Sequence, residues 1–234
     1  SNGEAGGVRR VITDRLDDEG AERWKAPSLE GESIAFLQYT LGITVAAGII
    51  AILLGLVLAL GRRSDNTWIS RPTFWLIEFV RSTPIRIQLF FVYFGLPTVG
   101  VRLSALTTGI LVLGVHYACY MAEVYRAGID AIPKGQWEAC TALSLSPQRT
   151  WRAVVLPQVI RRIVPSAGNQ IIALFKETPF LIVVGVGEMV FVAQQFSSAT
   201  FRAIEPFTIA GLIFLVASYP TSVLMRKLEA RLAQ

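Results

Sequence analysis

Three long stretches without charged side chains constrain the fold more than any other feature of the chain. They are Ser33–Leu60, Leu103–Ala122 and Pro206–Met225. A helix needs about 20 apolar residues to cross the hydrocarbon core of a bilayer. A buried helix in a large soluble protein would explain any one stretch, but 234 residues with only 17% charged side chains offer little amphipathic helix to cover three. The sequence therefore predicts a single all-α integral membrane domain.

The basic residues show which side of the membrane each loop occupies. The opposite side carries only Arg102 and Arg202 in its loops. Most of the basic residues flank the other ends of the spans: Arg62, Arg63, Arg71, Arg126, Lys134, Arg149, Arg152, Arg161, Arg162, Arg226, Lys227 and Arg231. Basic loops stay in the cytoplasm. The net charge of +5 therefore indicates membrane topology, not nucleic-acid binding.

We expect about five membrane spans within a domain at 33–228. Their predicted positions are 34–60, 72–95, 104–127, 164–187 and 206–226, with an external loop at 188–205. The preceding segment, 1–32, is rich in glycine and acids and has no signal-peptide character, so we expect it to be a polar extracytoplasmic segment. Whether a further hydrophobic helix precedes Ser1 is left open.

A polar segment at about 133–160 separates the third and fourth spans. It is too polar to cross a bilayer, yet small residues follow Glu138 at helical spacing. Ser146 is a good helix N-cap and Pro147 suits the first helical position, so a second short helix should run towards Leu156. Pro157 should then disturb that helix. The pattern predicts a cytoplasmic helical hairpin that could seat in another protein's groove.

Two spans carry the same polar interruption: a basic residue, any residue, then Thr-Pro. The residues are Arg81, Thr83 and Pro84, with Glu78 one turn earlier, and Lys176, Glu177, Thr178 and Pro179. Proline removes a backbone donor, so both helices should kink or break there. Broken helices with charges at mid-membrane commonly build transport pathways.

In the functional interpretation of these charges, Arg81 and Lys176 attract a substrate carboxylate, Thr83 and Thr178 donate hydrogen bonds, and Glu78 or Glu177 meets a positive group. The alternative is structural: Glu78 pairs with Arg81, and Lys176 pairs with Glu177 or with a partner subunit.

Other polar residues favour structural roles. His116, the single histidine, is better explained by a hydrogen bond between helices than by a proton relay. Glu123 and Arg126 fit an ion pair at a helix end better than a binding site. Cys119 and Cys140 suggest neither a disulfide nor a metal site.

The chain lacks Gly-x-x-x-x-Gly-Lys-Ser/Thr, His-Glu-x-x-His and Gly-x-Ser-x-Gly. These patterns bind nucleotide phosphates, hold catalytic zinc and present a nucleophile, respectively. The chain is therefore not expected to be an enzyme or to hold a cofactor, and any ATP that drives it must be hydrolysed by another polypeptide.

The polar hairpin resembles the coupling-loop signature of prokaryotic ABC-importer permeases. That signature reads Glu-Ala-Ala, three residues, Gly, nine residues, Ile, any residue, Leu-Pro. The matching residues here are Glu138, Ala139, Cys140, Ser144, Val154, Leu156 and Pro157. Cys140 and Ser144 depart from the pattern, although both are small.

Flanking segments are similar to the polar-amino-acid branch of these permeases (His/Glu/Gln/Arg/opine). They are Phe79–Pro84, Glu123–Gly128 and Lys176–Pro179. The segment Glu205–Pro220 is similar to the ectoine/hydroxyectoine branch. The resemblance covers Phe36 to the C-terminus.

The resemblance implies a type I ABC-importer fold in the cell inner membrane. It also implies a dimer of ABC ATPase subunits that binds ATP-Mg, a second permease chain, identical or similar, and an extracytoplasmic substrate-binding protein. In this family the Lys-Glu-Thr-Pro region lies at the gate, and the substrate is a polar amino acid or a related zwitterion.

The alternative function is a gradient-driven secondary transporter or a channel for small polar solutes. Few spans, no inverted repeat and the patterned hairpin weigh against it. A membrane enzyme is a second alternative, but no nucleophile, metal cluster or acid–base pair is recognisable.

Overall fold

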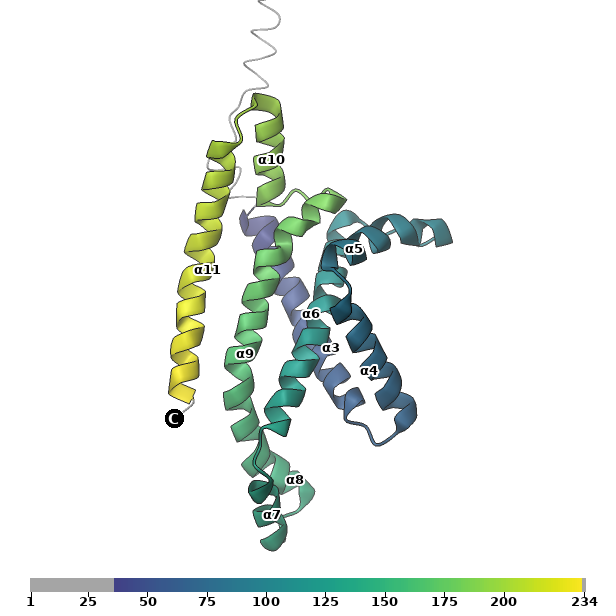
Figure 1. Ribbon diagram of the computed structural model, residues 1–234, viewed down its shortest axis with the longest axis vertical. Coiled ribbons are helices and arrows are strands. Elements are labelled where there is room, and N and C mark those ends of the chain that lie inside the picture. Colours follow the sequence, from purple (N-terminus) through teal and green to yellow (C-terminus); the bar gives the residue numbers. More distant parts are fainter. Residues whose placement is uncertain (1–35, 233–234) are drawn as a thin grey trace, which may run out of the picture.

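A computed structural model describes residues 36–232, which fold entirely into helices and short connections over that range. The segment expected at 1–32 lies outside the described residues. Figure 1 shows long helices side by side, with α9 between α6 and α11, and a short helical hairpin beyond one end of the bundle. Within the described residues, four helices are long and apolar enough to span a membrane: Gln38–Arg62, Ala105–Asp130, Pro147–Val184 and Ile204–Arg231.

The centre of the bundle is the pair α3 (Gly42–Arg62, after a π-helical turn at Phe36–Leu41) and α6 (Ala105–Asp130). Small residues let the two backbones approach closely. A Cβ atom at Gly55 would lie 2.6 Å from Met121 Cβ, and one at Gly114 would lie 2.8 Å from Ile50 Cβ. Close approach through small residues is how helices associate in lipid, where apolar surface alone gives no preference for a protein partner. Gly55 of α3 and Gly114 of α6 are therefore close-packing positions between the two helices.

The predicted second span at 72–95 is two helices, not one. α4 (Thr67–Ser82) ends before Thr83-Pro84, and α5 (Ile85–Phe90) follows with short π and 3₁₀ segments at Phe91–Gly95 and Leu96–Val99. In Figure 1, α5 turns away from the direction of α4. The proline removes the hydrogen bond that would have continued α4, so the break expected within this span is confirmed.

The hairpin also differs from its prediction. Its first arm is α7 (Lys134–Ala142), and its second arm starts with α8 (Pro147–Arg149). That second arm does not stop at Pro157, because α8 continues through a π segment (Thr150–Val155) into α9 (Leu156–Glu177). Pro157 lies in the first turn of α9, directly after the change in hydrogen-bond spacing, where a missing N–H costs little.

The predicted external loop at 188–205 is largely helical. After a 3₁₀ segment at Thr178–Val184 come α10 (Met189–Thr200) and α11 (Ile204–Leu232). Glu188 is fully buried and caps α10 by accepting hydrogen bonds from the backbone N–H groups of Val190 and Phe191, at 2.9 and 2.7 Å. Burial raises the pKa of this carboxyl to about 7, although the two N–H groups act in the opposite direction. Glu188 is therefore a buried helix cap.

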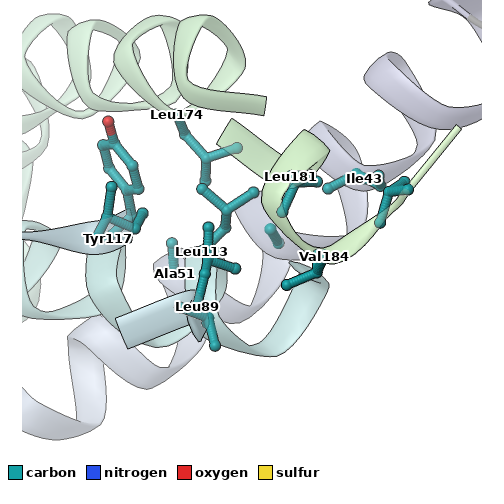
Figure 2. Packing of buried hydrophobic residues seen from close by; sticks show 12 residues of the cluster. Ile43, Ala51, Leu89, Leu113, Tyr117, Leu174, Leu181 and Val184 are labelled. Carbon is teal, nitrogen blue, oxygen red and sulfur yellow. The ribbon is translucent and has the colours of Figure 1, made fainter. Parts of the chain in front are cut away.

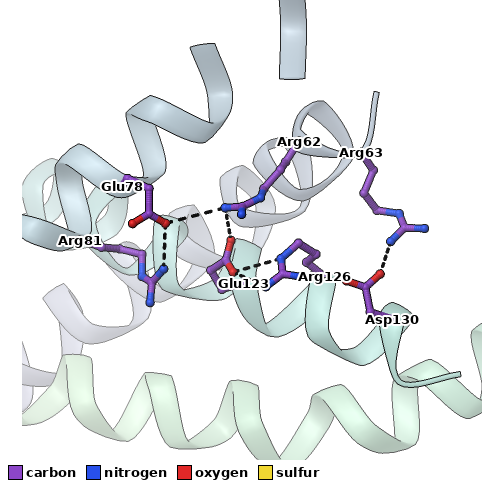
Figure 3. A network of polar contacts seen from close by, with 7 residues as sticks. All are labelled: Arg62, Arg63, Glu78, Arg81, Glu123, Arg126 and Asp130. Carbon is purple, nitrogen blue, oxygen red and sulfur yellow. Dashed lines mark hydrogen bonds and ion pairs between the residues drawn. The ribbon is translucent and has the colours of Figure 1, made fainter. Parts of the chain in front are cut away.

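Charged side chains join α3, α4 and α6 near one end of the bundle (Figure 3). Glu123 on α6 accepts from Arg62 on α3 at 2.6 Å and from Arg126 at 2.8 Å. The predicted Glu123–Arg126 pair is confirmed. The network also contains Arg63–Asp130, Arg126–Asp130, Arg81–Glu78 and Arg62–Glu78.

The main apolar cluster joins both interrupted helices to the central pair (Figure 2). Leu89 of α5 and Leu181 of the 3₁₀ segment are fully buried there, against Leu113 of α6. Residues just after each predicted interruption therefore belong to the core of the chain.

The turn between α7 and α8 closes with the hydrogen bonds of a Schellman motif. The N–H of Leu145 donates to the carbonyl of Cys140 at 3.0 Å, and that of Ser144 donates to Thr141 at 2.9 Å. Ser144 has φ = 51°, the left-handed region that favours glycine. The serine at the family's glycine position thus keeps the glycine-like backbone.

Gly55→Ala is expected to destabilise the protein by about 1–3 kcal/mol, because its methyl group would overlap Met121 on α6. The measurement is the thermal unfolding midpoint of the detergent-purified chain. Gly42→Ala is the matched control, because nothing lies within 4 Å of a Cβ at Gly42. Equal midpoints for the two variants would contradict close packing at Gly55.

Ser144→Gly is expected to stabilise the hairpin turn by about 0.5–1 kcal/mol, because glycine tolerates a positive φ. Amide hydrogen exchange in the peptide covering 138–157 should slow by about two- to fivefold. Ser146→Gly is the control: Ser146 has φ = −62°, so glycine relieves no strain there. Slower exchange in both variants would show that the effect is not the backbone angle of Ser144.

Candidate functional site

The first interruption is shaped by Thr83 and Pro84. Thr83 adopts an extended backbone (φ −104°, ψ 130°), as expected of a residue that precedes proline. Its hydroxyl donates to the carbonyl of Phe79 at 2.7 Å. The break frees carbonyl groups at the end of α4, and such groups need partners inside the protein because lipid offers none.

Gln88 supplies those partners from the first turns of α5. Its Nε2 donates to the carbonyl of Val80 at 2.7 Å and to that of Thr83 at 3.0 Å. Its Oε1 lies 3.1 Å from Nδ1 of His116 on α6. The interhelical hydrogen bond expected of His116 is confirmed. The role of Gln88 was missed from the sequence, where the signal was an amide four residues after a proline within an apolar span.

The second interruption lies against the first. Thr178 is fully buried, and its hydroxyl donates to the carbonyl of Phe175 at 2.9 Å where α9 gives way to the 3₁₀ segment. The guanidinium of Arg86, just after the first break, lies 4.1 Å from the ring centroid of Phe180, just after the second. At Thr178-Pro179 the helix is not interrupted: Thr178 keeps helical backbone angles (φ −56°, ψ −31°), and the predicted kink or break is a change from α to 3₁₀ geometry. The two Thr-Pro segments, far apart in sequence, thus pack against each other.

A polar cavity of about 410 Å³ opens between the two breaks. Its wall includes Arg81, Arg86, His116, Tyr120 and Glu177. Arg81 Nε and Glu177 Oε2 are buried and have no hydrogen-bond partner among the described residues. Buried charged atoms without partners are costly, so two of opposite sign at one cavity mark a candidate ligand site.

The predicted pathway residues divide between this cavity and other environments. Arg81, Thr83, Pro84 and Glu177 line it. Glu78 lies behind Arg81, with their side chains 3.4 Å apart, so the structural alternative holds for this pair.

Lys176 is not beside Arg81. With Pro179 it lines a separate groove against α10 and α11, and it makes no ion pair with Glu177 among the described residues. Adjacent positions on a helix point about 100° apart. Lys176 therefore lines the groove beside α11, whereas Glu177 lines the cavity beside Arg81. Thr178, the next residue, is fully buried.

The hairpin forms a second candidate site, projecting beyond the bundle (Figure 1). Its inner side is a small apolar core with Val155 and Val159 buried, and Trp137 and Trp151 pack edge to face at 5.6 Å between ring centroids. Cys140 points into the hairpin and is buried.

The outer side of the hairpin is open. Glu138, Ala139 and Ser144 are exposed, and the side chain of Leu143 at the tip is 72% exposed. Glu138 makes no ion pair or side-chain hydrogen bond within the described part of the chain. Of the other signature residues, Val154 is half-buried, whereas Leu156 and Pro157 are exposed. The outer side of the hairpin thus presents an exposed acid without a partner among the described residues and an exposed leucine.

Known proteins with similar sequences are permeases. Residues 32–234 match the family described as binding-protein-dependent transport system inner membrane component. A probable amino-acid ABC transporter permease of Sinorhizobium fredii is 40% identical over 183 residues, which cover 78% of this chain and 79% of the relative. The arginine transport system permease ArtQ of Bacillus subtilis is 36% identical, covering 84% and 90% of the two chains. The glutamine permease GlnP of Escherichia coli is 33% identical, covering 82% and 89%.

Solved structures agree. A crystal structure of an amino acid ABC transporter with histidines is 34% identical, covers 85% of this chain and 94% of its own, and superposes with a TM-score of 0.80. The MetNI methionine transporter, at 20% identity and a TM-score of 0.69, shares the fold. From the matched family, the relatives and the shared helical architecture, the chain belongs to the inner-membrane permease components of binding-protein-dependent ABC importers.

Proposed function

We propose that this permease imports a polar amino acid or a related zwitterion such as ectoine. The observation that carries the proposal is the cavity between the two helix breaks, where Arg81 and Glu177 present unpartnered buried atoms of opposite charge. A zwitterion carries a carboxylate for the arginine and a cationic group for the glutamate. The printed names of the relatives, which include arginine and glutamine permeases, support this substrate class.

In the proposed assembly the hairpin lies in the cytoplasm and docks on a dimer of ABC ATPase subunits. These partner chains bind and hydrolyse ATP-Mg, and the permease binds no cofactor itself. The exposed surface formed by Glu138, Ala139 and Leu143 supports a docking role. The concentration of basic residues at this end of the spans supports its cytoplasmic orientation.

A second permease chain, identical or similar, completes the pathway. Among the described residues, only 6% of the apolar span of α11 is buried, and Phe90 and Phe91, at the end of α5 and just after it, are exposed. Such surfaces need lipid or another helix to cover them. At the opposite end from the hairpin, the region around α10 is where an extracytoplasmic binding protein would deliver solute.

Transport then follows from two packings of the broken helices. ATP binding brings the ATPase subunits together and favours one arrangement of the hairpins, and hydrolysis favours the other. The first Thr-Pro break is suited to such a change, because the carbonyl groups of Val80 and Thr83 accept hydrogen bonds from the side chain of Gln88 and not from the backbone of a continuous helix.

Glu138→Ala is expected to weaken ATPase association or coupling, because it removes the exposed acid of the docking surface. The measurement is the ATPase activity of the complex in nanodiscs, with and without solute-loaded binding protein. We expect stimulation by the binding protein to fall at least about tenfold, corresponding to the loss of roughly 1.4 kcal/mol of coupling.

Asp65→Ala is the matched control, since Asp65 is an exposed acid between α3 and α4, away from the hairpin. Its stimulation should equal that of the wild type. If no ATPase associates with the wild-type chain, the docking role proposed for the hairpin is refuted.

Glu177→Gln is expected to reduce uptake of a zwitterionic amino acid about tenfold or more, because the cavity loses its carboxylate. Lys176→Gln should reduce it much less, since Lys176 lines a different groove. Uptake into proteoliposomes containing the complete transporter, together with basal ATPase activity, separates solute recognition from assembly. An equal or larger loss for Lys176→Gln would contradict the assignment of the solute to the cavity between the breaks.

A further inference from the structure

Three arginines gather around the connection between α3 and α4, and two of them are neutralised. Arg62 pairs with Glu123 at 2.6 Å, and Arg63 pairs with Asp130. Arg71, one turn into α4, is exposed and makes no ion pair or hydrogen bond within residues 36–232. One full positive charge of this cluster is therefore left for a partner outside the chain.

Arg71 lies in a groove between two exposed tryptophans. The groove has a volume of about 420 Å³ and is lined by Thr67, Trp68, Arg71, Pro72 and Trp75. Residues Trp68 and Trp75 are 88% and 68% exposed. Positions i, i+3 or i+4, and i+7 share one face of a helix, so the two indoles flank the guanidinium.

Exposure of two indole rings to water is unfavourable, so we expect lipid or another molecule to cover them. Tryptophan is enriched at membrane–water interfaces, where its ring lies at the level of the lipid headgroups. Arginine forms bidentate hydrogen bonds with phosphate, and cationic side chains near a membrane surface attract anionic lipids. The groove also lies at the N-terminal end of α4, a 16-residue helix whose dipole adds positive potential there.

We propose that Arg71, Trp68 and Trp75 form a binding site for the headgroup of an anionic phospholipid. In this site the guanidinium donates hydrogen bonds to the phosphodiester oxygens, and the two indoles hold the glycerol region and the start of the acyl chains. The proposal rests on the membrane location of the chain and not on the identity of the transported solute.

The position of the groove separates it from the docking hairpin. In Figure 1 the connection between α3 and α4 lies beside the bundle, whereas α7 and α8 project farther along the long axis. The groove therefore occupies the flank of the bundle near the ends of the spans, where headgroups lie, rather than the projecting surface proposed for the ATPase.

The test is native mass spectrometry of the full chain, released from mixed phosphatidylglycerol and phosphatidylcholine. The wild type should retain phosphatidylglycerol in preference to phosphatidylcholine. Arg71→Ala should lower the relative affinity for phosphatidylglycerol about fivefold, since one interfacial cation contributes about 1 kcal/mol. Arg71→Lys should recover part of that preference, because it restores the charge without the planar fork.

Arg102→Ala is the matched control: Arg102 is also exposed, but it lies at the opposite end of the spans and has no flanking tryptophans. Its lipid preference should equal that of the wild type. Trp68→Ala combined with Trp75→Ala should lower retention of both lipids. Unchanged thermal unfolding midpoints show that the variants are folded. If a variant does not fold, the deciding measurement is made on the wild type. Brominated phosphatidylglycerol should then quench its tryptophan fluorescence more strongly than brominated phosphatidylcholine does.

Several results would overturn the proposal. Equal retention of phosphatidylglycerol by wild type and Arg71→Ala would remove the arginine from any lipid site, and equal affinity of the wild type for both lipids would leave only an uncharged tryptophan anchor. Displacement of phosphatidylglycerol by millimolar inorganic phosphate would indicate a site for a free anion. Loss of the lipid when an ATPase dimer is bound would assign the groove to that partner.

Discussion

The close approach of α3 and α6 is the constraint on which the rest of the structure depends. Gly55 and Gly114 let the two backbones come together where any larger side chain would collide with the facing helix. In lipid this contact must come from van der Waals packing, because apolar side chains gain nothing from leaving an apolar solvent. Once the pair is formed, Glu123 is held near Arg62, and the apolar cluster around Leu113 has a fixed wall against which both interrupted helices pack.

The two Thr-Pro interruptions create a candidate ligand site beside the α3–α6 pair. Each Thr-Pro break would be unstable in a bilayer if its carbonyl groups faced lipid. The chain solves this locally, through Gln88 at the first break and the Thr178 hydroxyl at the second. Because both breaks are packed on α6, the charged residues next to them meet at one cavity, and Arg81 and Glu177 are left with capacity for a ligand. The interruptions that remove backbone hydrogen bonds therefore also place polar side chains at a cavity between apolar spans.

Much of this arrangement was predictable from local patterns. Apolar length predicted the spans, and Thr83-Pro84 predicted the broken second helix. The errors came where tertiary packing overrides a local rule. The second arm of the hairpin was expected to be a short helix that Pro157 disturbs. The hydrogen-bond spacing does change in the π segment just before Pro157, but the helix continues into α9. The segment 188–205 reads as a polar loop, yet burial of Glu188 as a cap stabilises α10.

The sequence by itself determined that the chain is a membrane-embedded helical bundle with a polar helical hairpin, because apolar length, proline positions and the polar pattern of the hairpin are local properties. Only the tertiary structure decided how the charges are used. Lys176 and Glu177 are neighbours in sequence, but successive helical positions point about 100° apart, so one faces the groove beside α11 and the other the cavity beside Arg81. Likewise, the sequence shows three arginines near the start of α4. In the folded chain, Arg62 and Arg63 pair with acids of α6, and Arg71 has no partner among the described residues. Only the tertiary structure could decide this, because pairing depends on which helices pack together.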